Sequence, residues 1–280
     1  MTPSDATPVR PARDIRKERR PFRTPRAAAS SSALSGYLLL AAVLVAWEAA
    51  TRLGVVRADV LPPATAVLGE LWHLGASGEL WRQAGPTLGR VLAGFALGGG
   101  LGALLGFGCG VFPAFGRACR VTVEFLRPMP SVALIPIGIL FLGLGFGLCV
   151  AIAAFACAWP AYVAALAGAA AAGPELRDTA RVYGLTPGET IRQVRAPAAV
   201  PQVLAGLRVA LGVAVAVTVT TEMAASPNGL GSFILESSLA RRPEGMYAGI
   251  VAVGLLGAAL NAGFMAIRNR ALRWLPDGGR

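Results

Sequence analysis

Residues 85–112, GPTLGRVLAGFALGGGLGALLGFGCGVF, form an apolar run long enough to cross a lipid bilayer as a helix. Glycines recur in this run every four residues. A four-residue step places them on one slowly drifting stripe of a helix, where the missing side chains let a second helix approach closely. The run therefore predicts a membrane helix whose glycine stripe serves helix packing rather than chemistry. The stripe consists of Gly94, Gly98, Gly102, Gly106 and Gly110.

Five further apolar runs have about the 20 residues that a spanning helix needs. The chain has 280 residues, of which 55% are hydrophobic and 15% charged, and this is too apolar for one soluble globule. We therefore expect an all-α, polytopic membrane protein with about six transmembrane helices. The five further runs are 34–52, 123–142, 149–171, 199–223 and 246–267.

The charge of the chain is unevenly distributed. Basic residues outnumber acidic ones by 26 to 15, and in a hydrophobic chain this favours loops on the anionic cytosolic membrane face over nucleic-acid binding. If both termini are cytosolic, eighteen basic residues fall on the cytosolic side and four on the other. The sequence thus predicts two cytosolic termini, contact with the lipid bilayer and no nucleic-acid partner.

The chain divides into three parts by composition. Residues 1–33 are rich in Pro, Arg, Ser and Ala and predict a disordered, basic cytosolic tail. Residues 34–84 would hold the first spanning helix and an extracytoplasmic segment. Residues 85–272 would hold the other spans, together with a long cytosolic loop at 172–198.

Three prolines lie in the third predicted span, and each removes a backbone donor. We expect this span to be bent or to begin irregularly. Irregular backbone at membrane depth must be shielded by protein or line a wet cavity, so Pro130 and Pro136 are candidates for a translocation path. Kinked packing explains them equally well. The third proline is Pro128.

Charged residues inside the predicted spans are costly and often functional. Glu222 is a further candidate for the path, although a position at the membrane interface also explains it. Arg127 and Arg208 could offer positive charge to an anionic solute. The interpretation that we favour for both arginines is a topology anchor at the cytosolic boundary.

The 172–198 loop carries an ordered series of helix start and stop signals. Pro174 and Glu175 suit the first turn of a helix, and Gly184 suits the left-handed residue that ends one. Thr186 and Glu189 then form a Thr-x-x-Glu capping box, which starts a second helix. Two short helices joined at a glycine predict a compact projection outside the bilayer, suited to docking on a cytosolic partner.

This loop resembles the cytosolic signature of permeases of binding-protein-dependent importers. The signature reads Glu-Ala-Ala, three residues, Gly, nine residues, Ile-x-Leu-Pro. Asp178-Thr179-Ala180 stands for the opening triplet, Gly184 follows after three residues, and Val194-Arg195-Ala196-Pro197 follows after nine more. Thr179 and Ala196 are the larger departures and bear on the detailed fit to the partner.

Other segments, in order along residues 60–270, resemble the sulfonate, taurine and nitrate branch of these permeases. They are Leu61-Pro62-Pro63, Gly89-Arg90-Val91-Leu92-Ala93-Gly94-Phe95, Leu126-Arg127-Pro128-Met129-Pro130 with Leu134-Ile135-Pro136, and Thr221-Glu222-Met223 with Gly229-Leu230-Gly231.

The resemblance implies a type I permease fold of an ATP-binding-cassette (ABC) importer, with 85–272 as its transmembrane domain, in a bacterial inner membrane. It implies a permease homodimer, a cytosolic ABC ATPase dimer that binds ATP and Mg, and an extracytoplasmic solute-binding protein. The solute would be a sulfonate, taurine, nitrate or a similar small anion. The residues implied to couple to the ATPase are Glu175, Asp178, Thr179, Ala180, Arg181, Gly184 and Pro197.

Several other functions fit the sequence less well. An ATP-binding Gly-x-x-x-x-Gly-Lys loop needs a lysine, and the single lysine, Lys17, has no such glycines before it. With one histidine, His73, and four cysteines without a C-x-x-C pair, we expect no metal site, no cofactor on this chain and no catalytic residues. An ion-coupled secondary transporter is the main alternative, but it does not predict the capped loop.

Overall fold

The computed structural model describes residues 29–57 and 59–273, and every regular element in these ranges is helical. The chain divides into two units, residues up to Trp47 and residues from Glu48 onward. Most of helix α1 (Ala29–Arg52) belongs to the first unit, and its apolar side chains Leu38, Leu39 and Val45 are exposed. α1 begins at Ala29, five residues before the predicted span. The predicted tail up to residue 28 lies outside the described ranges.

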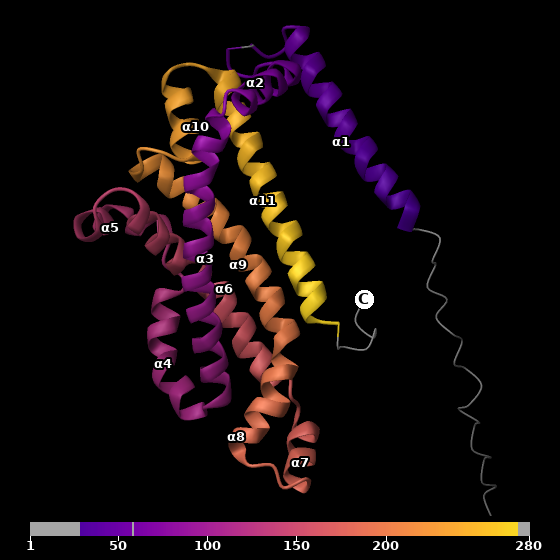
Figure 1. The fold of residues 1–280 in the computed structure, drawn as a ribbon, viewed down its shortest axis with the longest axis vertical. Coiled ribbons are helices and arrows are strands. Elements are labelled where there is room, and N and C mark those ends of the chain that lie inside the picture. The colour runs from indigo at the N-terminus through magenta and orange to yellow at the C-terminus, as the bar shows by residue number, and fades with distance from the viewer. Residues whose placement is uncertain (1–28, 58, 274–280) are drawn as a thin grey trace, which may run out of the picture. The chain divides into compact units, whose positions relative to one another are not determined.

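The second unit is a helical bundle with short helices at both ends (Figure 1). A single turn of π-helix, Ile191–Arg195, joins α8 to α9. The helices are α2 (Ala64–Ala76), α3 (Glu79–Val111), α4 (Pro113–Leu126), a 3-10 turn (Ser131–Leu134), α5 (Ile135–Leu142), α6 (Phe146–Ala170), α7 (Pro174–Val182), α8 (Pro187–Thr190), α9 (Ala196–Ala225), α10 (Leu230–Leu239) and α11 (Pro243–Ala271).

Within the described residues, four helices are long and apolar enough to cross a membrane, or five if a bent pair counts as one span. The four are α3, α6, α9 with the preceding α8, and α11, and they contain the second, fourth, fifth and sixth predicted spans. The bent pair contains the third. The first predicted span, 34–52, lies in α1, whose crossing of the membrane stays a prediction.

The third span differs from its predicted form. The segment 113–122, expected to be a cytosolic loop, is helical, because Pro113 suits a first helical turn and Arg120 pairs with Glu124 one turn further along α4, at 2.8 Å. The chain bends by 84° between α4 and the Ser131–Leu142 segment. The predicted bend at the prolines is confirmed, since Pro128 and Pro130 lie in the break.

The centre of the bundle is the contact between α3 and α6. A β-carbon added to Gly98, Gly102 or Gly106 would lie less than 3.0 Å from backbone atoms of α6. The two helix backbones are therefore in direct contact along the glycine stripe, as small residues permit in membranes. Gly94 and Gly110, at the ends of the stripe, face Ala153 and Ala169 of α6.

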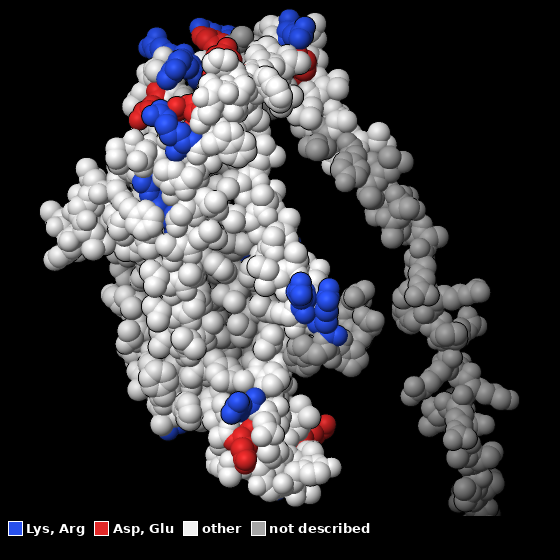
Figure 2. All heavy atoms as spheres, in the orientation of Figure 1, with Lys and Arg blue, Asp and Glu red and all other residues white. Residues whose placement is uncertain are grey.

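Helix α9 packs on the other side of α6 and completes the core. The buried cluster there joins Val91 of α3, Cys157 and Ala161 of α6, and Ala210 and Ala214 of α9. On the face seen in Figure 2, charged side chains gather near α2 and α10, around α7 and α8, and at the end of α11, with a broad uncharged surface between them. This distribution suits a bundle surrounded by lipid.

Candidate functional site

The first candidate site is the projection formed by α7 and α8 at one end of the bundle (Figure 1). Helix α7 begins at Pro174 and has Glu175 in its first turn, where an acidic group stabilises the positive end of the helix. Gly184 has φ +72°, and its amide donates to the Arg181 carbonyl at 2.9 Å. The predicted glycine stop is thus confirmed.

Helix α8 starts with the predicted capping box. The hydroxyl oxygen of Thr186 accepts from the Glu189 amide at 3.3 Å, and the Glu189 carboxylate accepts from the Thr186 amide at 2.8 Å. The chain therefore turns sharply between two helices whose ends are both satisfied by local hydrogen bonds.

The outward surface of this projection is more apolar than the signature suggested. Val182 is 86% exposed and Tyr183 is 81% exposed, beside the Gly184 turn. Asp178, expected to face a partner, pairs with Arg181 on the same helix at 3.0 Å. Sequence reasoning missed both exposed residues, because they fill the unspecified gap before the signature glycine.

The other signature positions have contacts within the chain. Ala180 is only 2% exposed, because it lies on the inner side of α7. It therefore contributes to packing within the loop and not to an outward surface. Thr179 donates its hydroxyl hydrogen bond to the Glu175 carbonyl at 2.8 Å, and Pro197 lies in the first turn of α9.

Arg195 attaches this projection to the bundle. Its guanidinium donates to the carbonyls of Gly110 at 2.9 Å and Val111 at 3.3 Å, at the end of α3, and to that of Ala169 at 3.1 Å, at the end of α6. Carbonyls at helix C-termini lack partners in their own helix and favour a cation. Displacement of the loop would thus act directly on the ends of both helices. Sequence reasoning gave Arg195 no role, because the helix ends that it contacts lie 26 to 85 residues away in the sequence.

Near the other end of the bundle, a buried ion pair joins α3 to α9. Arg90 donates to the Glu222 carboxylate at 2.6 Å, and the two side chains are 4% and 0% exposed. Thr87 donates to Glu222 at 2.9 Å, and the Gly231 amide donates to it at 3.0 Å. Arg90 also donates to the carbonyl of Asn228 at 2.7 Å.

This pair corrects the proposed path role of Glu222. The carboxylate is fully buried and has three donors, because α3, α9 and the start of α10 enclose it. It is a structural acid in this conformation, not a lining residue. The sequence did hold a signal for this pair. Two of the segments quoted for the family resemblance each contain a single charged residue in an apolar run, and the two charges have opposite signs.

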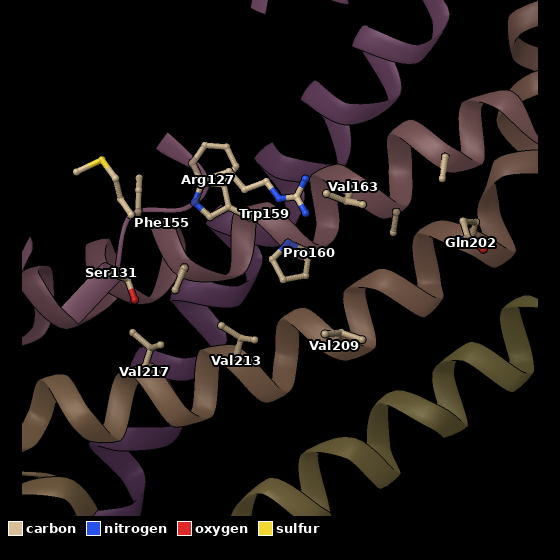
Figure 3. Close-up of a pocket in the computed structure, with 14 residues that line it drawn as sticks. Arg127, Ser131, Phe155, Trp159, Pro160, Val163, Gln202, Val209, Val213 and Val217 are labelled. Carbon is tan, nitrogen blue, oxygen red and sulfur yellow. The ribbon is translucent and has the colours of Figure 1, made fainter. Parts of the chain in front are cut away.

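The second candidate site is a cavity of about 540 Å³ between the α4–α5 break, α6 and α9 (Figure 3). Its polar lining residues are Arg127, Ser131, Trp159 and Gln202. The path candidates Pro130 and Pro136 are not among its lining residues, although Met129 and Ser131 on either side of Pro130 are. Proline bends the chain there, and its neighbours reach the cavity.

Arg127 follows directly after α4, so that about 20 Å of helix separates it from the turn at Phe112. Its side chain lines the cavity, and its interpretation as a topology anchor stays a prediction. No three His, Cys, Asp or Glu side chains in residues 29–57 and 59–273 are grouped so that they could hold a metal ion.

A bundle of long apolar helices, with a rigidly capped projection at one end and a polar cavity between its helices, defines a multi-pass membrane transport component. Residues 98–274 match the family described as "Binding-protein-dependent transport system inner membrane component", and the chain belongs to this family. It is the permease subunit of an ABC importer and so a transport subunit.

Relatives with named functions are similar to this chain over most of its length. An aliphatic sulfonates transport permease protein, SsuC of Bacillus subtilis, is 28% identical over 86% of this chain and 87% of its own length. The taurine transport system permease protein TauC of Escherichia coli is 26% identical over 84% of this chain and 87% of its own. Inward-facing structures of the MetNI methionine ABC transporter share the fold, with a TM-score of 0.56 at 19% identity, over 69% of this chain and 94% of theirs.

Proposed function

We propose that this permease carries a small sulfonate, such as an aliphatic sulfonate or the zwitterion taurine, across a bacterial inner membrane. A separate ATPase, docked on the α7–α8 projection, would drive it. The proposal of a sulfonate-like solute draws on relatives named for aliphatic sulfonates and taurine. The proposed coupling role is supported by the shape of the α7–α8 projection.

The observation that carries this proposal is the shape of the projection. Its turn is fixed by Gly184 and by the Thr186–Glu189 cap, so that Val182 and Tyr183 are held outward. Exposed apolar side chains on a rigid turn are typical of a docking surface. Arg195 connects the same loop to the ends of α3 and α6, which gives a docked subunit a mechanical route into the bundle.

We propose an assembly of the kind that the family resemblance implies. Two permease copies would form the path, and two ATPase copies would bind ATP and Mg and close around the bound nucleotide. An extracytoplasmic binding protein would deliver the solute at the opposite face. In this orientation both termini would be cytosolic. A contact can drive such a change only if its affinity differs between the inward-open and outward-open states.

The test is the double substitution Val182→Ser/Tyr183→Ser in the permease co-expressed with its ATPase. We expect the variant to fold as the wild type does and to lose about tenfold or more in ATPase capture, because two exposed apolar anchors are removed. Leu239→Ser is the matched control, since Leu239 is also exposed, at 76%, but lies in α10. ATP hydrolysis and co-purification are the measurements.

Two results would overturn the proposal. One is unchanged ATPase capture in the double variant. The other is solute uptake by purified permease without any ATPase, which would support the ion-coupled alternative.

A further inference from the structure

The polar groups that line the cavity of Figure 3 are mainly hydrogen-bond donors. Arg127 brings the cavity's single formal charge, and none of its described lining residues is acidic. Within the described residues, the Arg127 side chain has no hydrogen bond or ion pair of its own. A guanidinium offers five donors and no acceptor, so it is suited to carboxylate, sulfonate or phosphate groups.

A second donor at this cavity lacks a partner. The indole nitrogen of Trp159 is buried and makes no hydrogen bond within residues 29–57 and 59–273. Phe155 packs edge to face on the indole, with ring centroids 5.5 Å apart, and holds it in place. Leaving a buried donor unpaired costs free energy, so an indole N–H here is best satisfied by an acceptor in the cavity.

The opposite wall of the cavity is apolar. Figure 3 shows Val209, Val213 and Val217 of α9 facing the side where Arg127 and Trp159 lie. Donors on one side and aliphatic groups on the other suit a ligand with an anionic head and a short apolar body. None of the described lining residues is acidic, so this cavity favours an aliphatic sulfonate over taurine, whose ammonium group would find no partner there.

The position of Arg127 supports the same conclusion. Arg127 follows the last residue of α4, and its exposed side chain lines the cavity. The 84° bend exposes this position, because the chain leaves the direction of α4 immediately after it.

We propose that Arg127 and Trp159 form an anion-binding station, which holds the sulfonate or carboxylate head of an aliphatic solute while the valines of α9 contact its body. This inference rests on the proposed transport function and adds to it the residues that recognise the charge. Gln202 and Ser131 supply further hydrogen-bonding groups to the same cavity.

The experiment uses the full-length permease in nanodiscs of zwitterionic lipid, with ethanesulfonate as the probe. Its unfolding temperature is measured against probe concentration. We expect a saturable rise with ethanesulfonate and none with ethanesulfonamide, which has a similar shape without the charge. A ligand that binds only the folded state stabilises it in this way.

Four variants assign the effect to residues. Arg127→Gln is expected to weaken apparent binding by about tenfold or more, and Arg127→Lys is expected to restore part of it. Trp159→Phe keeps a ring but removes the N–H, and is expected to weaken binding by about 2- to 10-fold. Arg208→Gln is the matched control, because it removes an arginine that does not line this cavity.

Equal stabilisation by the sulfonamide, wild-type binding in Arg127→Gln, or an equal loss in Arg208→Gln would each overturn the station. The first comparison needs only the wild-type chain, so a variant that fails to fold does not remove the test. Failure of the station is distinguishable from failure of the transport proposal. Val182→Ser/Tyr183→Ser is expected to lose ATPase capture while keeping the ethanesulfonate effect.

Discussion

Two ion pairs in this permease have the same chemistry in opposite surroundings. Arg90 and Glu222 are 2.6 Å apart with side chains 4% and 0% exposed, whereas Arg181 and Asp178 are 3.0 Å apart and 81% and 66% exposed. Buried charges must remain paired, because one charge left alone loses its hydration without compensation. Exposed pairs are screened and contribute little.

The comparison distinguishes the interactions that stabilise the helical bundle from those that a partner protein could contact. The buried pair joins α3 to α9 across 132 residues of sequence, and the start of α10 also donates to its carboxylate. The exposed pair joins two positions of one short helix. We infer that the buried ion pair holds the helices of the bundle together. Partner binding by the projection would instead depend on its backbone shape and on the exposed side chains of Val182 and Tyr183.

The largest expected effect comes from breaking the buried pair on one side. Glu222→Leu is expected to lower the free energy of unfolding by about 3–5 kcal/mol, because Arg90 remains buried without its carboxylate. Thermal unfolding in nanodiscs measures this loss. The control is Arg90→Leu/Glu222→Leu, which removes both charges and is expected to be clearly more stable than the single variant. A double variant as unstable as the single one would contradict the argument.

The next effect tests the glycine stripe against a neighbouring glycine on the same helix. Gly102→Ala is expected to cost about 1–3 kcal/mol, because its β-carbon would overlap the backbone of Ala158 on α6. Gly100→Ala is the matched control, since a β-carbon there meets nothing within 4 Å. It should be neutral or slightly stabilising in a helix. Equal unfolding temperatures for the two variants would show that α3 and α6 do not pack this closely.

The features that the sequence predicted well are local ones. The Gly184 stop and the Thr186–Glu189 cap depend on residues within one turn of each other, so their chemistry determines the backbone directly. The apolar runs at 85–112 and 149–171 likewise identified α3 and α6 without any knowledge of neighbours.

The features that the sequence did not predict depend on long-range contacts or on polar helices. The start of α4 was missed because Arg117, Arg120 and Glu124 lower the hydropathy of a segment that is nonetheless helical. The Arg90–Glu222 pair spans 132 residues; each residue is a lone charge in an apolar run, but the local sequence does not show which charge is its partner. The cavity at Arg127 lies at the bend between α4 and α5, and the sequence indicated only the prolines at that bend.

A smaller effect is expected at the turn of the projection. Gly184→Ala places a β-carbon at φ +72°, a conformation that costs an L-residue about 1–2 kcal/mol. Because the turn is local, we expect reduced ATPase coupling with little change in the unfolding temperature of the bundle. Gly188→Ala is the matched control, since Gly188 has no positive φ and open space around it. ATP hydrolysis in the assembled transporter separates the two variants.

The smallest effect is expected for the exposed pair. Asp178→Asn removes a carboxylate that is 66% exposed and paired with Arg181, and such pairs contribute less than about 1 kcal/mol to stability. We expect unchanged unfolding and an ATPase affinity within about twofold of the wild type, because the apolar anchors remain. The measurement is ATPase capture at low and high salt. A loss as large as that of Val182→Ser/Tyr183→Ser, and restricted to low salt, would reverse the comparison, since the charge of Asp178 would then be recognised by the partner across the interface.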